Sequence, residues 1–308
     1  MNRDGKYGRD IVLPKVHNFE LSPEPEKGED LIAHSQINWD PIAPMGTPDV
    51  EDISYGALQD SVNEGMLTDV KREGWEPVKN RVTVASVLYP MIGYKAYVHH
   101  MEFIYNCGRR NPDYEFALAY VARSEIDRAR NRLVYTALEA KSEFLYFYDT
   151  DTHMPSDLMT RMLEVMTFDE NIVAMSPLYH VRGYPFELMV FKESHYEPIL
   201  VTLKEAKKHA DEHGLYDAWG LGCGTTLTRV STFAQWNGPW YRTTPNHTED
   251  AWFCSLARRF NPKARFVVDT TIEAGHELNE PVVIRTSNAK HLKKMFGPSG
   301  WYQETTQG

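Results

Sequence analysis

The sequence predicts an α/β protein in which a sheet built from parallel βαβ units is flanked by helices. Short apolar runs alternate with helical patterns from about residue 81 to residue 178, as in successive βαβ units. The run Phe144–Tyr148 is apolar without period-2 alternation, which indicates a strand with both faces covered. It is followed by two carboxylates, Asp149 and Asp151, at the strand end where open α/β sheets place their ligands.

The composition is that of an ordinary globular protein. Hydrophobic residues make up 42% and charged residues 25% of the 308 residues, enough chain for one large domain and an appendage. No segment reaches the ~18 consecutive apolar residues of a membrane span, and the N-terminal region is charged where a signal peptide is apolar, so we expect a cytoplasmic protein. The three cysteines are widely spaced without a CxxC pair, which suggests neither a disulfide framework nor a zinc site.

The net charge of −10 is concentrated at the N-terminus. Residues 1–80 contain 16 acidic and 8 basic residues, and the rest of the chain contains 27 and 25. This arm is rich in Pro, Glu and Asp, and we expect it either to lie along the body through scattered apolar groups or to be disordered. The near-neutral remainder offers no basic stripe for nucleic acid. We expect an acidic arm over residues 1–80, a globular domain over residues 81–283 and a basic tail over residues 284–308.

The first elements of the domain are predicted by local patterns. Val82–Leu88 is a β-branched apolar run that ends at Tyr89-Pro90 and predicts the opening strand. A helix over about residues 96–105 and a strand over residues 114–121 follow. The next helix is expected from Ser124 to Ala140, with Ser124 and Asp127 as a capping pair.

Arg130 falls on the apolar stripe of this last helix. It lies four residues after Ile126 and three before Leu133, and both of these residues mark the buried face. A guanidinium directed inward needs an anion, and the first candidates are a phosphate or one of the carboxylates Asp149 and Asp151. The alternatives are a snorkelling side chain at the edge of the stripe and a structural salt bridge.

These elements together resemble the nucleotide-sugar half of a GT-A glycosyltransferase, particularly one of family 2. The resemblance covers roughly residues 81–280 and rests on the opening strand with its Pro loop, on Ala129-Arg130-Asn131 and on Asp149-Thr150-Asp151. It implies a mixed, Rossmann-like sheet, a nucleoside diphosphate sugar as donor, and a Mn²⁺ or Mg²⁺ ion held mainly by Asp151. The donor contacts that it implies come from Tyr89, Pro90, Arg130, Asn131 and Asp149.

A glycine-rich turn, Trp219–Gly224, precedes an apolar strand over Thr225–Thr228. Its glycines lack the GxGxxG spacing between strand and helix that a dinucleotide site needs, so we reject such a site. The resemblance places Gly222 near the donor sugar. The alternative is a tight turn in which backbone approaches backbone.

The triplet Thr248-Glu249-Asp250 opens a predicted helix that runs to about Arg258. As a structural feature it is a helix start, with Thr248 as cap and two acids that complement the macrodipole. It is also similar to the Thr-Glu-Asp motif of inverting family 2 enzymes. That similarity implies that Asp250 takes the proton from the acceptor hydroxyl, a poor nucleophile, while Glu249 binds or orients the acceptor.

His276 follows the last predicted strand, Ala264–Val268. A lone His is usually a structural group. The resemblance implies instead that His276 completes a metal site with Asp149 and Asp151, since a neutral imidazole is an acceptable manganese ligand beside carboxylates.

The predicted function is therefore metal-dependent transfer of one sugar from a nucleoside diphosphate sugar to an acceptor hydroxyl, with inversion. The Gln-x-x-Arg-Trp motif of the family's processive synthases is absent, which favours single transfer. The acceptor is expected to be a glycan, a protein, a small molecule or a modified nucleic-acid base. The alternatives are a nucleotidyltransferase or another metal-dependent phosphoryl-transfer enzyme, and a non-catalytic nucleotide-sugar-binding protein.

Overall fold

The computed structural model describes most of the chain after the acidic arm. The arm up to residue 71, the predicted donor contacts Tyr89 and Pro90, and the end of the basic tail from residue 297 all lie outside the described residues. The described residues are 72, 74–88, 94–122, 124–183, 185–192, 200–245, 247–279 and 282–296.

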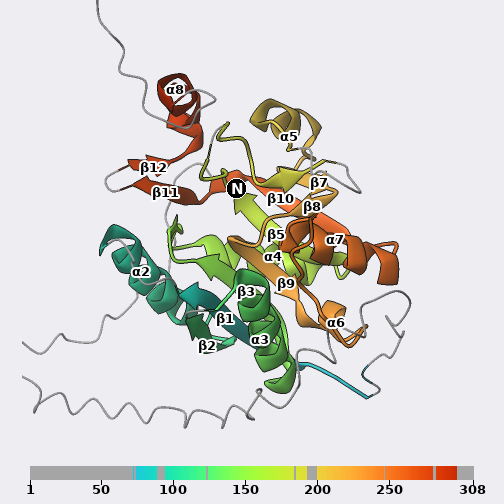
Figure 1. Ribbon diagram of the computed structural model, residues 1–308. Coiled ribbons are helices and arrows are strands. Elements are labelled where there is room, and N and C mark those ends of the chain that lie inside the picture. The colour runs from blue at the N-terminus through green and yellow to red at the C-terminus, as the bar shows by residue number, and fades with distance from the viewer. Residues whose placement is uncertain are drawn as a thin grey trace, which may run out of the picture. The chain divides into compact units, whose positions relative to one another are not determined.

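The main sheet has seven strands in the order β2-β1-β3-β9-β5-β10-β7 (Figure 1). Strand β9 runs antiparallel to both of its neighbours, and β7 runs antiparallel to β10, while the other pairs are parallel. The sheet is therefore mixed and flanked by helices, which confirms the predicted fold class. The bounds are β1 (Val78–Leu88), β2 (Glu115–Ala122), β3 (Ser142–Asp149), β5 (Ile172–Leu178), β7 (Leu215–Ala218), β9 (Thr225–Arg229) and β10 (Arg265–Glu273).

Strand β3 is covered on both faces, as its lack of alternation predicts. It lies between β1 and β9. Tyr146 of β3 is paired with Val84 of β1 on one side and with Leu227 of β9 on the other. Phe144 and Tyr146 belong to one apolar cluster, and Leu145 and Phe147 belong to the other. All four side chains are at most 1% exposed, so β3 is a rigid base for the carboxylates that follow it.

The helices cover the two faces of the sheet. Apolar residues of α3 (Ile126–Glu139), α6 (Val230–Phe233) and α7 (Glu249–Phe260) pack with the cluster of Leu145 and Phe147. Those of α2 (Tyr94–Arg110) and α4 (Leu158–Phe168) pack with the other cluster. The remaining elements are β4 (Thr152–His153), β6 (Val190–Phe191), α5 (Leu203–His209), β8 (Gly220–Leu221), β11 (Gly275–Asn279), β12 (Val282–Ile284) and α8 (Thr286–Phe296).

One predicted helix cap is wrong and the other is confirmed. Helix α3 begins after Glu125, whose side chain makes no capping hydrogen bond. Asp127 instead accepts hydrogen bonds from the backbone N–H groups of Arg128 and Thr243, because a distant segment packs against this end of α3. At α7, Thr248 accepts from the N–H of Ala251, as predicted.

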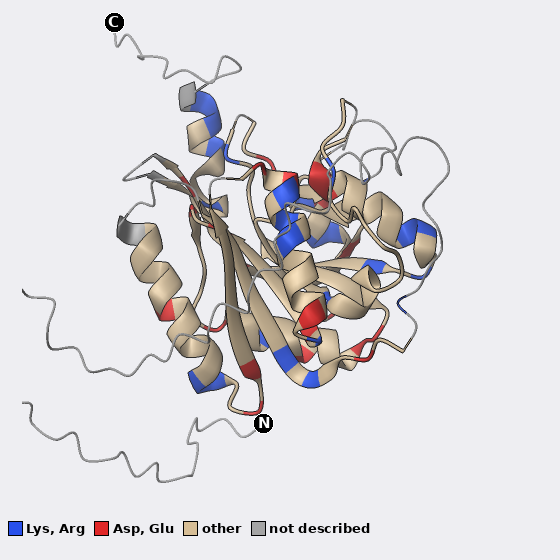
Figure 2. Ribbon diagram, turned by 60° about the horizontal axis from the view of Figure 1, so that its bottom comes forward, with Lys and Arg blue, Asp and Glu red and all other residues tan. Residues whose placement is uncertain are grey.

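Two surface features complete the description. Helix α8 carries Lys290, Lys293 and Lys294 without an acid, and their basic character is visible along it in Figure 2. Within the described part of the chain, no helix has the length and apolarity to cross a membrane.

Candidate active site

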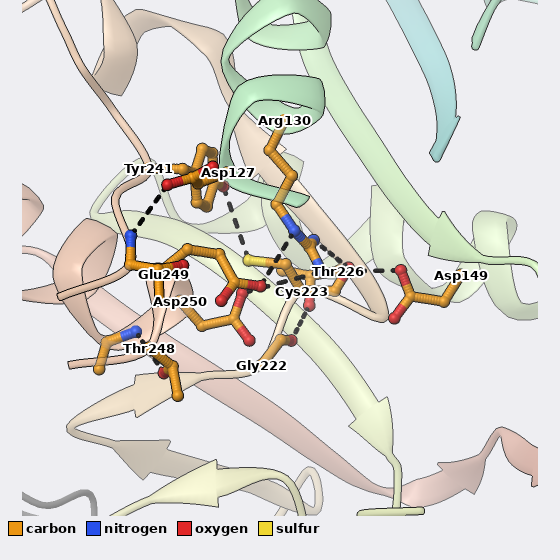
Figure 3. Close-up of polar contacts among 12 residues, drawn as sticks. Asp127, Arg130, Asp149, Gly222, Cys223, Thr226, Tyr241, Thr248, Glu249 and Asp250 are labelled. Carbon is orange, nitrogen blue, oxygen red and sulfur yellow. Dashed lines mark hydrogen bonds and ion pairs between the residues drawn. The ribbon is translucent and has the colours of Figure 1, made fainter. Parts of the chain in front are cut away.

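The first cluster of the site, the Arg130 cluster, consists of Arg130, Asp149, Glu249 and Asp250 (Figure 3). Arg130 is 3% exposed. Its Nη2 lies 3.6 Å from Asp149 Oδ1 and 4.0 Å from Asp250 Oδ1, and its Nε lies 3.5 Å from Glu249 Oε1. Its Nη1 donates a hydrogen bond of 3.0 Å to the carbonyl oxygen of Cys223. The inward direction predicted for this guanidinium is confirmed, which excludes the snorkelling alternative.

One guanidinium therefore faces three carboxylates in a buried place. Although burial opposes its charge, the carboxylates of Asp250 and Asp149 hold the pKa of Arg130 well above its ordinary value. Burial, together with the charge of Asp250, raises the pKa of Glu249 to about 7. Burial also raises the pKa of Asp149, against the opposing effect of Arg130. These carboxylates depend on a single cation, so removing it leaves buried charge uncompensated.

Asp250 is placed at the N-terminus of α7 but is not its cap. Thr248 provides the capping oxygen, and Asp250 is 6% exposed. Its Oδ1 is buried and, among the described residues, has no hydrogen-bond donor. A fixed carboxylate with a free acceptor oxygen is suited to receive a proton from a ligand.

The second cluster, the Asp151 cluster, consists of Asp151, Arg182 and His276. Asp151 Oδ2 accepts a hydrogen bond from Arg182 Nη1 at 3.1 Å and lies 3.2 Å from His276 Nε2. Burial alone would raise the pKa of Asp151, but the bond to His276 and the nearby guanidinium lower it. Burial would lower the pKa of His276, but its contact with Asp151 raises it. The contacts with His276 and Arg182 thus both favour the ionised form of the Asp151 carboxylate.

Strand pairing brings this cluster together. In the antiparallel pair β4–β11, His276 is the partner of Thr152, and the N–H of Glu277 donates to the carbonyl of Asp151. His276 therefore lies within a strand and not merely after the last one. Its ring stacks on Tyr179 at 4.8 Å between centroids. A Cβ at Gly224 would collide with the Tyr179 ring, so this glycine leaves the space that the stack requires.

Two residues of the Asp151 cluster, Asp151 and His276, carry atoms that can bind a divalent cation. Nδ1 of His276 lies 2.8 Å from the carbonyl oxygen of His180 and donates to it, which in the neutral imidazole leaves the lone pair of Nε2 facing Asp151. Histidines that bind metals are commonly oriented by such a bond. A carboxylate and an imidazole suit Mn²⁺, and Mg²⁺ usually takes its other ligands from phosphate and water.

The predicted set of three metal ligands is not assembled. Asp149 is directed toward Arg130, whereas Asp151 and His276 contact each other. Among the side chains that the structure describes, no group of three or more His, Cys, Asp or Glu is arranged to hold a metal ion. In the structure Asp151 and His276 therefore contact each other, while the ion pair of Asp149 among the described residues is with Arg130.

Asn131 and Gly222, two predicted donor contacts, make close contacts within the chain. The Oδ1 of Asn131 accepts from the N–H groups of Trp240 and Tyr241, and its Nδ2 donates to the carbonyl oxygens of Tyr241 and Asp127. This uses the full hydrogen-bonding capacity of the amide, so Asn131 attaches that loop to α3. Gly222 lies in a turn where backbone approaches backbone, which is the alternative stated for it in the sequence analysis.

The N–H of Gly222 donates to the carbonyl oxygen of Met189 at 3.1 Å. A Cβ on Gly222 would overlap the Met189 side chain, so glycine is required there for a close approach.

Sequence reasoning missed Arg182 and Tyr179 as members of the site. The signal that could have found them was their place just after a fully buried strand, β5, whose carboxyl end meets the same edge of the sheet as that of β3.

Comparisons with known proteins give remote structural likenesses. No protein-family model matches the chain, and no curated protein does. A197 from STIV is 17% identical, with 67% of this chain and 91% of that chain covered and a TM-score of 0.46. GalNAc-T7 with UDP, GalNAc and Mn²⁺ is 12% identical, with 66% of this chain but only 44% of that chain covered and a TM-score of 0.46.

A third solved structure is a glycosyltransferase involved in the glycosylation of the major capsid of PBCV-1. It is 14% identical, with 70% of this chain and 98% of that chain covered and a TM-score of 0.34. Because the TM-scores are this low, none of these likenesses carries an argument about the activity of the chain.

Proposed function

We propose that this chain is a metal-dependent glycosyltransferase that moves one sugar from a nucleoside diphosphate sugar to an acceptor hydroxyl. One observation carries the proposal. The Nη2 atom of Arg130 lies 3.6 Å from Asp149 and 4.0 Å from Asp250, so the end of the Asp-x-Asp strand and the candidate base belong to one site. A transferase needs these two functions side by side, because the donor and the acceptor must meet there.

The donor end of the site is the Asp151 cluster. Asp151 and His276 would hold Mn²⁺ or Mg²⁺ together with oxygens of the donor diphosphate. The ion, when bound, supplies positive charge that stabilises the leaving diphosphate. The stack on Tyr179 and the bond to the His180 carbonyl keep His276 in position for this role.

The acceptor end is the N-terminus of α7. Asp250 accepts the proton of the acceptor hydroxyl as that oxygen attacks the anomeric carbon from the face opposite the diphosphate, which gives inversion. The Arg130 guanidinium lies 4.0 Å from Asp250 Oδ1 and places positive charge beside this carboxylate. Glu249, with a pKa of about 7, carries a proton in part of the neutral range and donates it in a hydrogen bond to the acceptor.

A thermal-shift panel tests the donor site. UDP, GDP, CDP and TDP are each added with and without Mn²⁺ to wild type, Asp151→Ala and Asp113→Ala, an exposed acidic residue on the α2–β2 connection. A nucleotide at 100 times its Kd stabilises the native state by about 2.7 kcal/mol. We expect a Mn²⁺-dependent shift for one nucleotide that is lost in Asp151→Ala and kept in Asp113→Ala.

The same panel can reject the proposal. No response to any nucleotide would remove the donor site. If a nucleotide does bind, its sugar derivatives are tested for transfer to candidate acceptors. A protein that cleaves them between the phosphates without forming a glycosidic bond would be a phosphoryl-transfer enzyme instead.

A further inference from the structure

Arg182 takes part in the Asp151 cluster from an exposed position. It lies in the segment between β5 and β6, and its side chain is 58% exposed, against 4% for Arg130. Its Nη1 lies 3.1 Å from Asp151 Oδ2, the oxygen that also faces His276 Nε2 at 3.2 Å. This is the only ion pair of Arg182 among the described residues.

A divalent ion held by Asp151 and His276 would compete with this guanidinium for Asp151 Oδ2. The ion needs the lone pairs of Asp151 Oδ2 and His276 Nε2, and those two atoms are the ones in contact. Because Asp151 Oδ2 already contacts Arg182 Nη1, a divalent ion at this oxygen would be repelled by the guanidinium charge. Entry of the metal therefore weakens the contact between Arg182 and Asp151 and favours its release.

The release of Arg182 is easy, whereas that of Arg130 is not. Exposed ion pairs contribute little to stability, because water solvates both partners when they separate. The released guanidinium stays attached to the segment between β5 and β6 and would be available to bind the phosphates of a donor held by the ion. A guanidinium matches phosphate oxygens through two parallel hydrogen bonds.

We propose that Arg182 is an exchangeable counter-ion, which neutralises Asp151 in the empty site, is displaced by the divalent cation and then binds the diphosphate of the donor. This inference rests on the proposed function. It predicts that the metal and the nucleotide bind with positive coupling, since the metal frees the group that the nucleotide uses. It also predicts that loss of Arg182 changes the two affinities in opposite directions.

Calorimetry on the full chain tests this without measuring turnover. Mn²⁺ alone is titrated first, and then, at saturating Mn²⁺, the nucleoside diphosphate that gives the largest shift in the panel. The variants are Arg182→Gln, Arg182→Lys and, as a matched control, Arg128→Gln. Arg128 is 47% exposed and pairs with Glu125 at 3.0 Å on the surface of α3.

In Arg182→Gln, we expect Mn²⁺ alone to bind about two- to fivefold more tightly, because its competitor is gone. We expect the nucleotide to bind about tenfold more weakly, because a charge-assisted hydrogen bond is lost. Arg182→Lys, which keeps the charge, lies between Arg182→Gln and wild type in both measurements. Arg128→Gln matches wild type.

Three results overturn the inference. Unchanged constants in Arg182→Gln, with wild type binding both ligands, contradict the role of Arg182 and leave the donor site intact. Two constants that shift in the same direction indicate a general structural effect and also contradict it. If wild type binds neither Mn²⁺ nor any nucleotide, the proposed function fails, and the role of Arg182 fails with it.

Discussion

The two clusters of the site have opposite charge ratios. In the Arg130 cluster one guanidinium faces three carboxylates, and the guanidinium side chain is 4% exposed. In the Asp151 cluster one carboxylate faces a guanidinium and an imidazole, and the side chains of Asp151 and Arg182 are 29% and 58% exposed. The difference indicates two distinct roles, because a buried charge must keep its partners, whereas an exposed charge can exchange them for a ligand.

The surrounding elements account for this difference. The Arg130 cluster lies between α3, β3 and α7, all of which contribute to the same apolar core. The Asp151 cluster lies on the turn between β3 and β4, on β11, and on the segment that joins β5 to β6 (Figure 1). We therefore expect substitutions in the first cluster to change stability or catalysis strongly and those in the second to change ligand affinity.

The largest expected effect is on turnover by Asp250→Asn. Loss of the general base lowers kcat by about 10²- to 10⁴-fold. The fold is retained, because the amide keeps the shape of the side chain and removes one of three clustered negative charges. Transfer kinetics measure the turnover, and circular dichroism on the same preparation shows whether the fold is retained. Turnover near that of wild type would show that Asp250 is not the base and that a retaining transfer has to be considered.

Arg130→Met compared with Arg182→Met tests the contrast in burial. Loss of Arg130 leaves three carboxylates without their cation and lowers the free energy of unfolding by about 3–5 kcal/mol. Loss of Arg182 changes it by less than about 1 kcal/mol. Urea denaturation of both variants without metal measures this. Equal losses would contradict the division of the site into a fixed and an exchangeable cluster.

The pH dependence of stability tests the crowding of negative charge around Arg130. The pKa of Glu249 is about 7 in the folded chain and 4.5 ordinarily, so between these values the folded state holds a proton that the unfolded chain has lost. Stability from this group is therefore full below about pH 4.5 and falls as pH rises through about 7.

We expect wild type to lose on the order of 1–3 kcal/mol more than Glu249→Gln between about pH 5 and about pH 8. Urea denaturation at a series of pH values measures it. Glu139→Gln is the control, because Glu139 is 51% exposed and pairs with Arg72 on the surface. Parallel pH profiles of wild type and Glu249→Gln would contradict the raised pKa.

The smallest expected effect separates capping from catalysis at α7. Thr248→Ala removes the side chain that caps the helix and lowers the free energy of unfolding by about 1 kcal/mol. Because Asp250 does not serve as the cap, turnover below the melting temperature stays close to that of wild type. A loss of turnover as large as that of Asp250→Asn would show that the cap itself holds the base in place.

Much of the fold was predictable, because periodicity and strand composition are local signals. The covered strand β3, the inward Arg130 and the Thr248 cap follow from neighbours in the sequence. The Ser124 cap was predicted with the same kind of signal and is wrong, because Asp127 is used by Thr243 from a distant loop. Local patterns fail where a tertiary contact competes for the same group.

Local sequence was enough to show which strand ends carry carboxylates and which helix face carries a guanidinium. Packing in three dimensions was needed to show that Arg130 pairs with Asp149, that Arg182 contacts Asp151, and that the amide of Asn131 is hydrogen-bonded to a distant loop. The physical reason is that side-chain periodicity gives the face of an element, whereas the partner across a space depends on how distant elements pack. The spacing of residues along the chain does not show how far apart two distant elements lie in the folded protein.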